Sequence, residues 1–268
     1  MFLPDLNNIS SFTITFLLLF AIIVMRYYLF ASVFYFIFHK FFKQVWLPKK
    51  VNPRNYNPNQ LKKELKWSTI SSIIFAFFGT IAILLWQNGL SKVYLNVRDY
   101  PIWYLPVSLL ILLFIHETYY YWLHRWMHLP KVFRIVHKVH HESNISSPFT
   151  AFSFHPLEGL TQAIFLPLLI LILPLHIYVI LVSLIIMTIS SFINHLDIEL
   201  FPKNFNRHFI GKWLIGATHH SLHHSQFKYN YGLYFTFWDR IKKTESDKYD
   251  HLFDSLMEKK NEQDKMSI

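Results

Sequence analysis

The 268-residue chain contains no cysteine and only six glycines. The missing thiols exclude disulfides, Cys-ligated iron–sulfur clusters and Cys-type zinc fingers. Charge is also scarce: Asp, Glu, Lys and Arg make up 16% of the residues, whereas 53% are hydrophobic and 19% are aromatic. This composition is too apolar for an ordinary soluble domain and predicts an integral membrane protein.

Long apolar runs account for the hydrophobic excess. A helix needs about 20 residues to cross a bilayer, and three runs reach that length, at residues 12–38, 67–86 and 102–122. The N-terminus has no Lys/Arg-rich leader, and its only early charge is Asp5, so we expect the first run to be a retained span. Residues 160–194 fit a helical hairpin that turns near Pro174. The sequence therefore predicts an all-α integral membrane protein with about three transmembrane helices, a helical hairpin and a cytosolic helical cap that carries the histidine motifs.

Positive charge gathers in loops beside the apolar runs. The formal net charge is +10, and residues 39–66 hold many Lys and Arg against a single acid, Glu64. This placement predicts a cytoplasmic loop that faces anionic headgroups, and no nucleic-acid partner. We expect N-terminal transmembrane helices and a basic cytosolic loop over 1–104, a region that carries the histidine motifs over 105–245, and a charged, solvated tail over 246–268.

Histidine occurs in three spaced motifs, one His-x-x-x-His and two copies of His-x-x-His-His. With 16 His in 268 residues, roughly 0.06 copies of the second pattern are expected by chance. Residues at i, i+3 and i+4 share one face of a helix, so we expect the three imidazoles of each copy to point to one place. Neutral imidazole binds iron, zinc, copper and nickel. The motifs therefore predict a metal site at His124, His128, His137, His140, His141, His220, His223 and His224.

Five further residues are candidates for the same site. His195 ends the hairpin and is a further candidate metal ligand. Glu117 lies two helical turns before the first motif on the same face, inside an apolar run. A carboxylate that orients a metal-bound histidine is the role we expect there, with an interfacial Glu as the alternative. His155 fits either a ligand or a supporting role, and His219 and Asp239 fit a supporting role beside the ligands.

The motifs together resemble one protein family. The runs that carry the resemblance are His124-Arg125-Trp126-Met127-His128, His137-Lys138-Val139-His140-His141, and residues 147–156, 219–224 and 230–240. They resemble the fatty acid hydroxylase / sterol desaturase superfamily, and most of all its sterol C5-desaturase (lathosterol oxidase) branch. The resemblance covers about residues 105–245. It implies a membrane-bound, non-haem di-iron oxidoreductase, with two iron ions as cofactor, O₂ as co-substrate and the eight boxed histidines as ligands.

The implied reaction desaturates or hydroxylates a lipid taken from the bilayer, and the resemblance indicates a sterol. Electrons must come from another protein, because the sequence has no flavin fingerprint, no Cys-ligated cluster and no His-Pro-Gly-Gly haem motif. We expect a cytochrome b5-like or ferredoxin-like donor. We also expect a multi-pass protein whose histidine motifs face the cytoplasm, in the endoplasmic reticulum of a eukaryote or the inner membrane of a bacterium.

Three alternatives remain open. A hydroxylase of fatty acyl, sphingolipid or alkylglycerol chains would use the same motifs, because they do not separate desaturation from hydroxylation. A histidine-rich metal transporter would place its ligands near mid-bilayer in broken helices, whereas these motifs lie outside the apolar runs. A lipid-binding relative with a vestigial site would not need the complete set of motifs.

Overall fold

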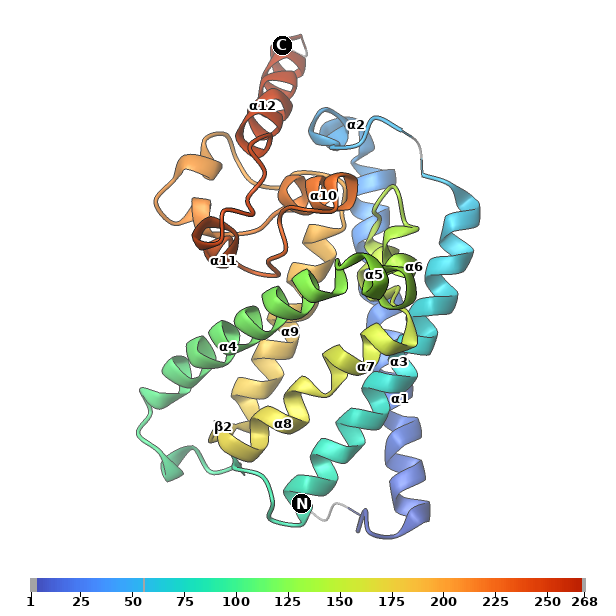
Figure 1. Ribbon diagram of the computed structural model, residues 1–268, viewed down its shortest axis with the longest axis vertical. Coiled ribbons are helices and arrows are strands. Elements are labelled where there is room, and N and C mark those ends of the chain that lie inside the picture. The colour runs from blue at the N-terminus through green and yellow to red at the C-terminus, as the bar shows by residue number, and fades with distance from the viewer. Residues whose placement is uncertain (1–3, 55, 267–268) are drawn as a thin grey trace.

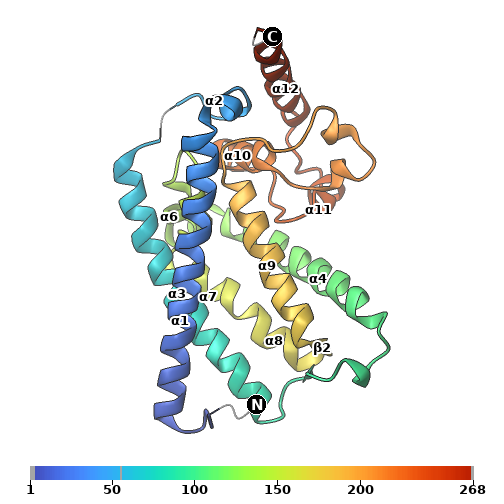
Figure 2. The ribbon, with the colours of Figure 1, turned by 180° about the vertical axis from the view of Figure 1, so that it is seen from behind.

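Helices α1 (Ile9–Tyr35) and α3 (Pro58–Gln87) run side by side along one side of the molecule (Figures 1 and 2). The computed structural model describes residues 4–54 and 56–266. Each of the two helices begins at an asparagine, Asn8 or Asn57, whose side-chain oxygen accepts a backbone N–H of the first turn. Such caps satisfy donors that a helix start leaves unpaired. The chain passes from α1 to α3 through a π-helical turn, η1 (Phe36–Phe41), then α2 (Lys43–Trp46) and η2 (Leu47–Lys49).

Three helices of the described chain are long and apolar enough to cross a membrane. They are α1 with its π-helical extension, α3, and α9 (Ile177–Asn194). The first two are predicted spans. The third predicted span forms α4 (Tyr104–Met127), which is a continuous helix but falls outside this set. His116, Glu117 and a run of tyrosines make its second half too polar, and the second arm of the hairpin takes its place.

The predicted hairpin is present and turns where the sequence indicates. Its first arm is α7 (Pro156–Ala163) followed by α8 (Phe165–Ile172), and its second arm is α9. The turn contains β2 (Leu175–His176), which pairs in parallel with β1 (Val93–Tyr94) of the connection between α3 and α4. Because α9 returns to the end of the hairpin at which α7 begins, the residues that follow α9 lie beside the C-terminal end of α4 (Figure 1).

The remaining elements form a cap at the end of the molecule that carries the C-terminus (Figure 1). Its α-helices are α5 (Pro130–Val136), α6 (Lys138–His141), α10 (Ala217–Gln226), α11 (Phe237–Ile241) and α12 (Tyr249–Met266). Short 3-10 turns join or precede them at η4 (Pro148–Phe152), η5 (Phe205–Arg207) and η6 (Gly211–Trp213), while η3 (Val97–Asp99) lies in the connection before α4.

Helix α12 corrects the expectation of a solvated tail. Tyr249, Phe253, Leu256 and Met257 are buried and pack with Leu222 of α10. Their spacing of three to four residues gives the helix one apolar face. The first half of the tail is therefore part of the packed cap.

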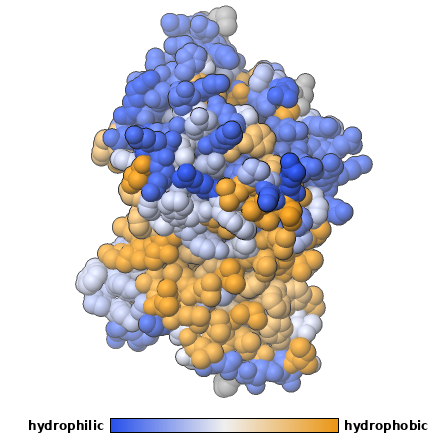
Figure 3. Space-filling view, in the orientation of Figure 1, coloured by the Kyte–Doolittle hydropathy of each residue, from blue (hydrophilic) through white to orange (hydrophobic). Residues whose placement is uncertain are grey.

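Exposed apolar side chains form a belt around the helices, and polar side chains cover the cap and the opposite end (Figure 3). Leu18 of α1, Leu110 of α4 and Leu168 of α8 are each more than half exposed. Exposed apolar surface of this extent is the mark of a lipid-facing surface. The chain is an all-α membrane protein with a polar cap.

Candidate metal centre

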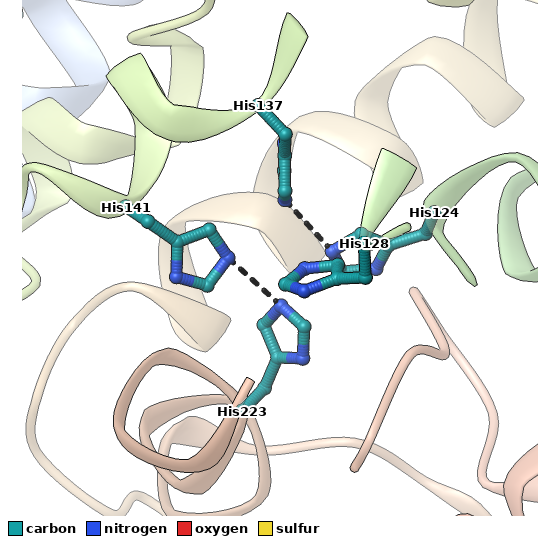
Figure 4. A group of neighbouring side chains, drawn as sticks. All are labelled: His124, His128, His137, His141 and His223. Atoms are coloured by element: carbon teal, nitrogen blue, oxygen red, sulfur yellow. Dashed lines mark hydrogen bonds between the residues drawn. The ribbon is translucent and has the colours of Figure 1, made fainter. Parts of the chain in front are cut away.

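Nine histidines collect into two adjacent groups where α4 and α9 end and the cap begins. Group 1 consists of His124, His128, His137, His141 and His223 (Figure 4), and group 2 consists of His140, His195, His220 and His224. Within each group every residue offers one ring nitrogen, and these nitrogens lie within 4.8 Å of one another. The groups adjoin, since the ring centroids of His141 and His224 are 4.6 Å apart. All nine predicted ligands are thus brought together.

The two copies of His-x-x-His-His are each divided between the groups, which corrects the expectation that each copy points to one place. In each copy the residues at i and i+4 join one group and residue i+3 joins the other. His140 leaves the first copy for group 2, and His223 leaves the second copy for group 1. Helical geometry explains the division: i and i+4 are about 40° apart around the axis, whereas i+3 lies about 60° from i in the opposite sense.

The Nε2 atoms within each group face one another at close range. In group 1 the Nε2–Nε2 distance is 3.1 Å both for His124–His137 and for His141–His223, the two pairs joined by dashed lines in Figure 4. In group 2 the corresponding distances are 3.2 Å for His140–His195, 3.0 Å for His195–His220 and 3.2 Å for His220–His224.

Hydrogen bonds on the other side of the rings fix which nitrogen carries the proton. Backbone carbonyl oxygens lie 2.9 Å from His124 Nδ1, 3.3 Å from His140 Nδ1, 2.8 Å from His195 Nδ1 and 2.7 Å from His223 Nδ1. A carbonyl can only accept, so each of these Nδ1 atoms carries the hydrogen and the neutral ring has its lone pair on Nε2. In the pair His140–His195 two lone pairs then face each other at 3.2 Å. That arrangement is repulsive unless a cation lies between them, so the donor set fits a metal ion.

Burial keeps these rings neutral. Desolvation first, and neighbouring imidazoles second, lower the pKa well below the ordinary value of 6.5 for His137, His140, His141, His220, His223 and His224. Neutral imidazole is the form that binds a metal. The same six side chains would resist protonation in mild acid.

Glu158 is a functional candidate that the sequence reasoning missed. Its Oε1 lies 2.9 Å from Nδ1 of His137, and both side chains are fully buried. A carboxylate in this position fixes the tautomer of a metal-bound histidine and makes it a stronger donor. The available signal was a carboxylate in the first turn of a helix, two residues after Pro156.

Glu117, to which we assigned that role, has a different one. Its carboxylate accepts hydrogen bonds from the backbone N–H groups of Leu233, Tyr234 and Phe235. It therefore holds the loop 230–235 and not an imidazole.

Asp239 holds the same loop from the other side. Its two carboxylate oxygens each accept a backbone N–H, from Tyr231 and Gly232, both at 2.9 Å. The carbonyl of Tyr231 in turn accepts from His124 Nδ1. Asp239 thus supports a group 1 histidine through one peptide, in line with the supporting role predicted for it.

His155 and His219 lie outside both groups. His155 caps α7: its Nδ1 accepts the backbone N–H of Leu157, and its ring lies 6.0 Å from that of Trp67 at a tilt of 44°. His219 is buried beside Tyr249 of α12, because a residue next to His220 points about 100° away around the helix. The structure therefore does not bring His155 among the candidate ligands, and a supporting role for His219 stays a prediction.

A cavity of about 50 Å³ lies beside group 2. His195 and His220 form part of its wall, and apolar side chains such as Phe75, Phe152 and Met187 form most of the rest. The cavity is therefore mostly apolar, with a few polar groups on the side of group 2.

Comparisons with known proteins agree on one family. The model for fatty acid hydroxylase matches residues 109–244. The chain is 32% identical to lathosterol oxidase of Homo sapiens, over 68% of this chain and 60% of that protein. It is 31% identical to a Delta(7)-sterol 5(6)-desaturase of Aspergillus fumigatus, over 88% of this chain and 76% of that protein.

A Delta(7)-sterol 5(6)-desaturase of Saccharomyces cerevisiae is 30% identical, over 76% of this chain and 54% of that protein. The chain spans about 60% of the length of the lathosterol oxidases that it matches. No solved structure matches the chain.

Proposed function

The chain belongs to the fatty acid hydroxylase family, and on this premise we propose that it is a di-iron, O₂-dependent oxidoreductase that desaturates or hydroxylates a membrane lipid. The observation that carries the proposal is the set of facing Nε2 atoms in two adjacent groups, with two lone pairs opposed in the pair His140–His195. The names of the relatives favour a Δ7-sterol as the lipid and desaturation as the reaction.

Each group would hold one iron ion. Group 1 supplies five imidazoles and group 2 supplies four, and imidazole suits iron among the divalent metals. When bound, two irons and O₂ supply an oxidant able to remove hydrogen from an unactivated C–H bond, which side-chain acids and bases cannot do.

The chain's own residues hold, orient and shield the site. All nine ligands are neutral, so two divalent ions leave the centre strongly cationic, and the buried carboxylate of Glu158 on His137 offsets part of that charge. The hydrogen bonds that Nδ1 of His124, His140, His195 and His223 donates keep these four rings in the tautomer whose Nε2 can bind metal. The mostly apolar cavity would bring a C–H bond of the lipid to His195 and His220.

The cap would face the cytoplasm and receive electrons there. The basic loop between α1 and α3 is at the same end of the molecule as the cap (Figure 1), and positive loops favour the cytoplasmic side. An acidic donor of the cytochrome b5 or ferredoxin type would be attracted to this face. In a eukaryote this corresponds to the endoplasmic reticulum, and in a bacterium to the inner membrane.

A hydroxylase of fatty acyl, sphingolipid or alkylglycerol chains remains the alternative within the same chemistry. A metal transporter is disfavoured because α10, which carries three of the ligands, belongs to the polar cap and not to a helix broken in mid-membrane.

The proposal is tested with purified protein in lipid vesicles that contain a Δ7-sterol, with a reductant and with or without O₂. We expect about two irons per chain and O₂-dependent loss of the sterol. The matched variants are His220→Ala, which removes a group 2 ligand, and His219→Ala, which removes its buried neighbour. We expect His220→Ala to retain about one iron per chain and to lose the reaction. We expect His219→Ala to retain about two irons per chain and the reaction. Full activity of His220→Ala, or uptake of metal into vesicles in place of lipid oxidation, would refute the oxidase.

A further inference from the structure

Phe227, the residue directly after α10, has a backbone conformation that is rare for a phenylalanine. Its φ angle is 64°, in the left-handed region. A side chain larger than that of glycine is disfavoured there, because Cβ crowds the following carbonyl oxygen. Helices that end in this conformation usually carry glycine or asparagine at that position. Strained backbone of this kind is concentrated at functional sites, so the side chain of Phe227 is a candidate for a function of its own.

The backbone of Phe227 makes a turn that glycine would make as well. Its N–H donates to the carbonyl oxygen of His223 at 2.8 Å and ends α10. The chain then reverses, so that the carbonyl oxygen of Tyr229 accepts the hydrogen of His223 Nδ1 at 2.7 Å. This turn orients a group 1 histidine without using any atom of the phenylalanine ring. The presence of phenylalanine in place of glycine therefore depends on what the ring contacts.

The ring of Phe227 covers group 1 from the outside. It belongs to a side chain that is 39% exposed, and its centroid lies 4.8 Å from that of His141 and 6.4 Å from that of His128. Phe133 of α5 lies 5.7 Å from it and contacts the same two histidines. Of the nine candidate ligands, His128 alone is partly exposed. Group 1 therefore comes closest to the surface beneath these two phenylalanine rings.

The surface around the two rings faces water or headgroups and not hydrocarbon. Lys131 and Arg134 of α5 and Lys228 after α10 are all exposed, and a charged side chain is costly in contact with hydrocarbon. Group 2 has different surroundings, since its four histidines are buried and two of them line the mostly apolar cavity. Within the described part of the chain, no group 1 histidine lines that cavity. Group 1 therefore adjoins the polar surface, and group 2 adjoins the cavity.

We propose that metal ions enter and leave the centre at group 1, and that the ring of Phe227 slows their exchange with water. The inference rests on the function proposed above and gives the two groups different access, group 1 to divalent iron from the aqueous phase and group 2 to the cavity. A soluble chelator should remove the iron of group 1 first, because only that group lies beneath a polar surface. The ring must move aside during this release, so its removal should speed the release.

The experiment measures iron release from the purified, iron-loaded protein in nanodiscs after an excess of a water-soluble chelator is added. For the wild-type protein we expect two phases, a faster one from group 1 and a slower one from group 2. Anomalous diffraction at the iron edge, from crystals of the protein recovered after the faster phase, should show the remaining iron among the histidines of group 2.

Phe227→Gly removes the ring and suits the left-handed backbone. We expect its faster phase to accelerate about tenfold or more, which corresponds to about 1.4 kcal/mol, and its slower phase to stay unchanged. Phe227→Tyr keeps an aromatic ring and should keep the wild-type rates. Lys243→Gly is the matched control for the backbone, because Lys243 is exposed and has a left-handed φ angle of 54°. Glycine relieves the same strain there, and release should be unchanged. Thermal unfolding reports whether each variant has folded.

Two results on the wild-type protein would overturn the inference without any variant: release of both irons at one rate, or a remaining iron found in group 1. An unchanged faster phase in Phe227→Gly, or an equal acceleration in Lys243→Gly, would overturn the role of the ring. Equal acceleration of both phases in Phe227→Gly would overturn it too, because the ring would then only hold the fold together.

In each of these cases the proposed function stands if the wild-type protein holds its irons and oxidises its lipid. A wild-type protein that binds no iron would refute the proposed function, and this inference with it.

Discussion

At the scale of single residues, hydrogen bonds donated by Nδ1 decide which nitrogen is free to bind a metal in four of the nine imidazoles. Four rings of the two groups donate to backbone carbonyls, and His137 faces the carboxylate of Glu158. The backbone cannot be removed by substitution, but the carboxylate can. Glu158 is therefore the position at which the support of the metal site is most directly tested.

Glu158→Gln should weaken iron binding. The amide oxygen can still accept from His137, but the negative charge that strengthens the donor and offsets the cationic centre is lost. Changes of this kind typically cost about 10–100-fold in metal affinity. Competition with a chelator measures the dissociation constant. The control is Glu142→Gln. The side chain of Glu142 is 42% exposed and pairs loosely with Lys63 at the surface. Equal affinities for both variants would contradict the role of Glu158.

The sequence identified the nine histidines but chose the wrong carboxylate. Ligand spacing is a local property of the chain, so the motifs could be recognised without a structure. Glu117 was chosen because helical periodicity places it on the same side of α4 as His124. Periodicity within one helix does not reveal what another helix contributes, and Glu158 reaches His137 from α7.

At the scale of elements, the loop 230–235 joins the cap to the histidines of group 1 and group 2. Glu117 and Asp239 accept its backbone N–H groups from two sides, and its Tyr231 carbonyl accepts from His124. Gly232 is needed at the centre, since a Cβ there would lie 2.5 Å from the carbonyl oxygen of Phe235 and 2.7 Å from Ile215 Cδ1.

Gly232→Ala should therefore displace the loop and destabilise the protein by roughly 1–3 kcal/mol, with loss of iron from group 1 before group 2. Thermal unfolding and iron content measure the two effects. Gly159→Ala is the matched control, because a Cβ at that position in α7 would meet Ile74 at an ordinary 3.5 Å and alanine is the better helix former. A Gly232→Ala protein as stable and as rich in iron as Gly159→Ala would show that the loop tolerates the added methyl group.

The division of each histidine motif between two groups also belongs to this scale. From the sequence we predicted that residues i, i+3 and i+4 share one face of the helix. In a regular helix these three positions lie within an arc of about 100° around the axis. The three imidazoles of one copy could all point to a single ion. In the structure they are divided between two adjacent groups, because α6 and α10 both lie at the junction of the groups and each contributes to both of them. The number of groups is a tertiary property and could not be read from either helix alone.

At the scale of the whole molecule, apolar runs predicted α1, α3 and α4, their order and the return of the hairpin. They did not predict which helix is the third apolar span, because the polar residues of α4 lie on its buried face. They also did not predict the packing of α12, whose apolar positions are few and meet their partners only in the folded cap.

The buried histidines should make the iron-free protein sensitive to acid. In the folded state the pKa values of six of them are lowered by burial, whereas in the unfolded chain they return to about 6.5. Above pH 6.5 neither state binds these protons, and the stability is fully present. Below it only the unfolded chain binds them, so the free energy of unfolding falls by about 1.4 kcal/mol per pH unit for each such histidine, until the folded pKa is reached.

Thermal unfolding of the chelated protein in detergent, from about pH 8 to about pH 5, measures this loss. The midpoint should be nearly constant above pH 6.5 and should fall steeply below it. A midpoint that does not change over the acidic half of the range would mean that the imidazoles are accessible to protons in the folded state.

Anomalous X-ray diffraction at the iron edge, from crystals of the iron-loaded protein, tests the central claim most directly. The account predicts two peaks, one among His124, His128, His137, His141 and His223, and one among His140, His195, His220 and His224. A single peak, or iron bound anywhere other than these two groups, would contradict it.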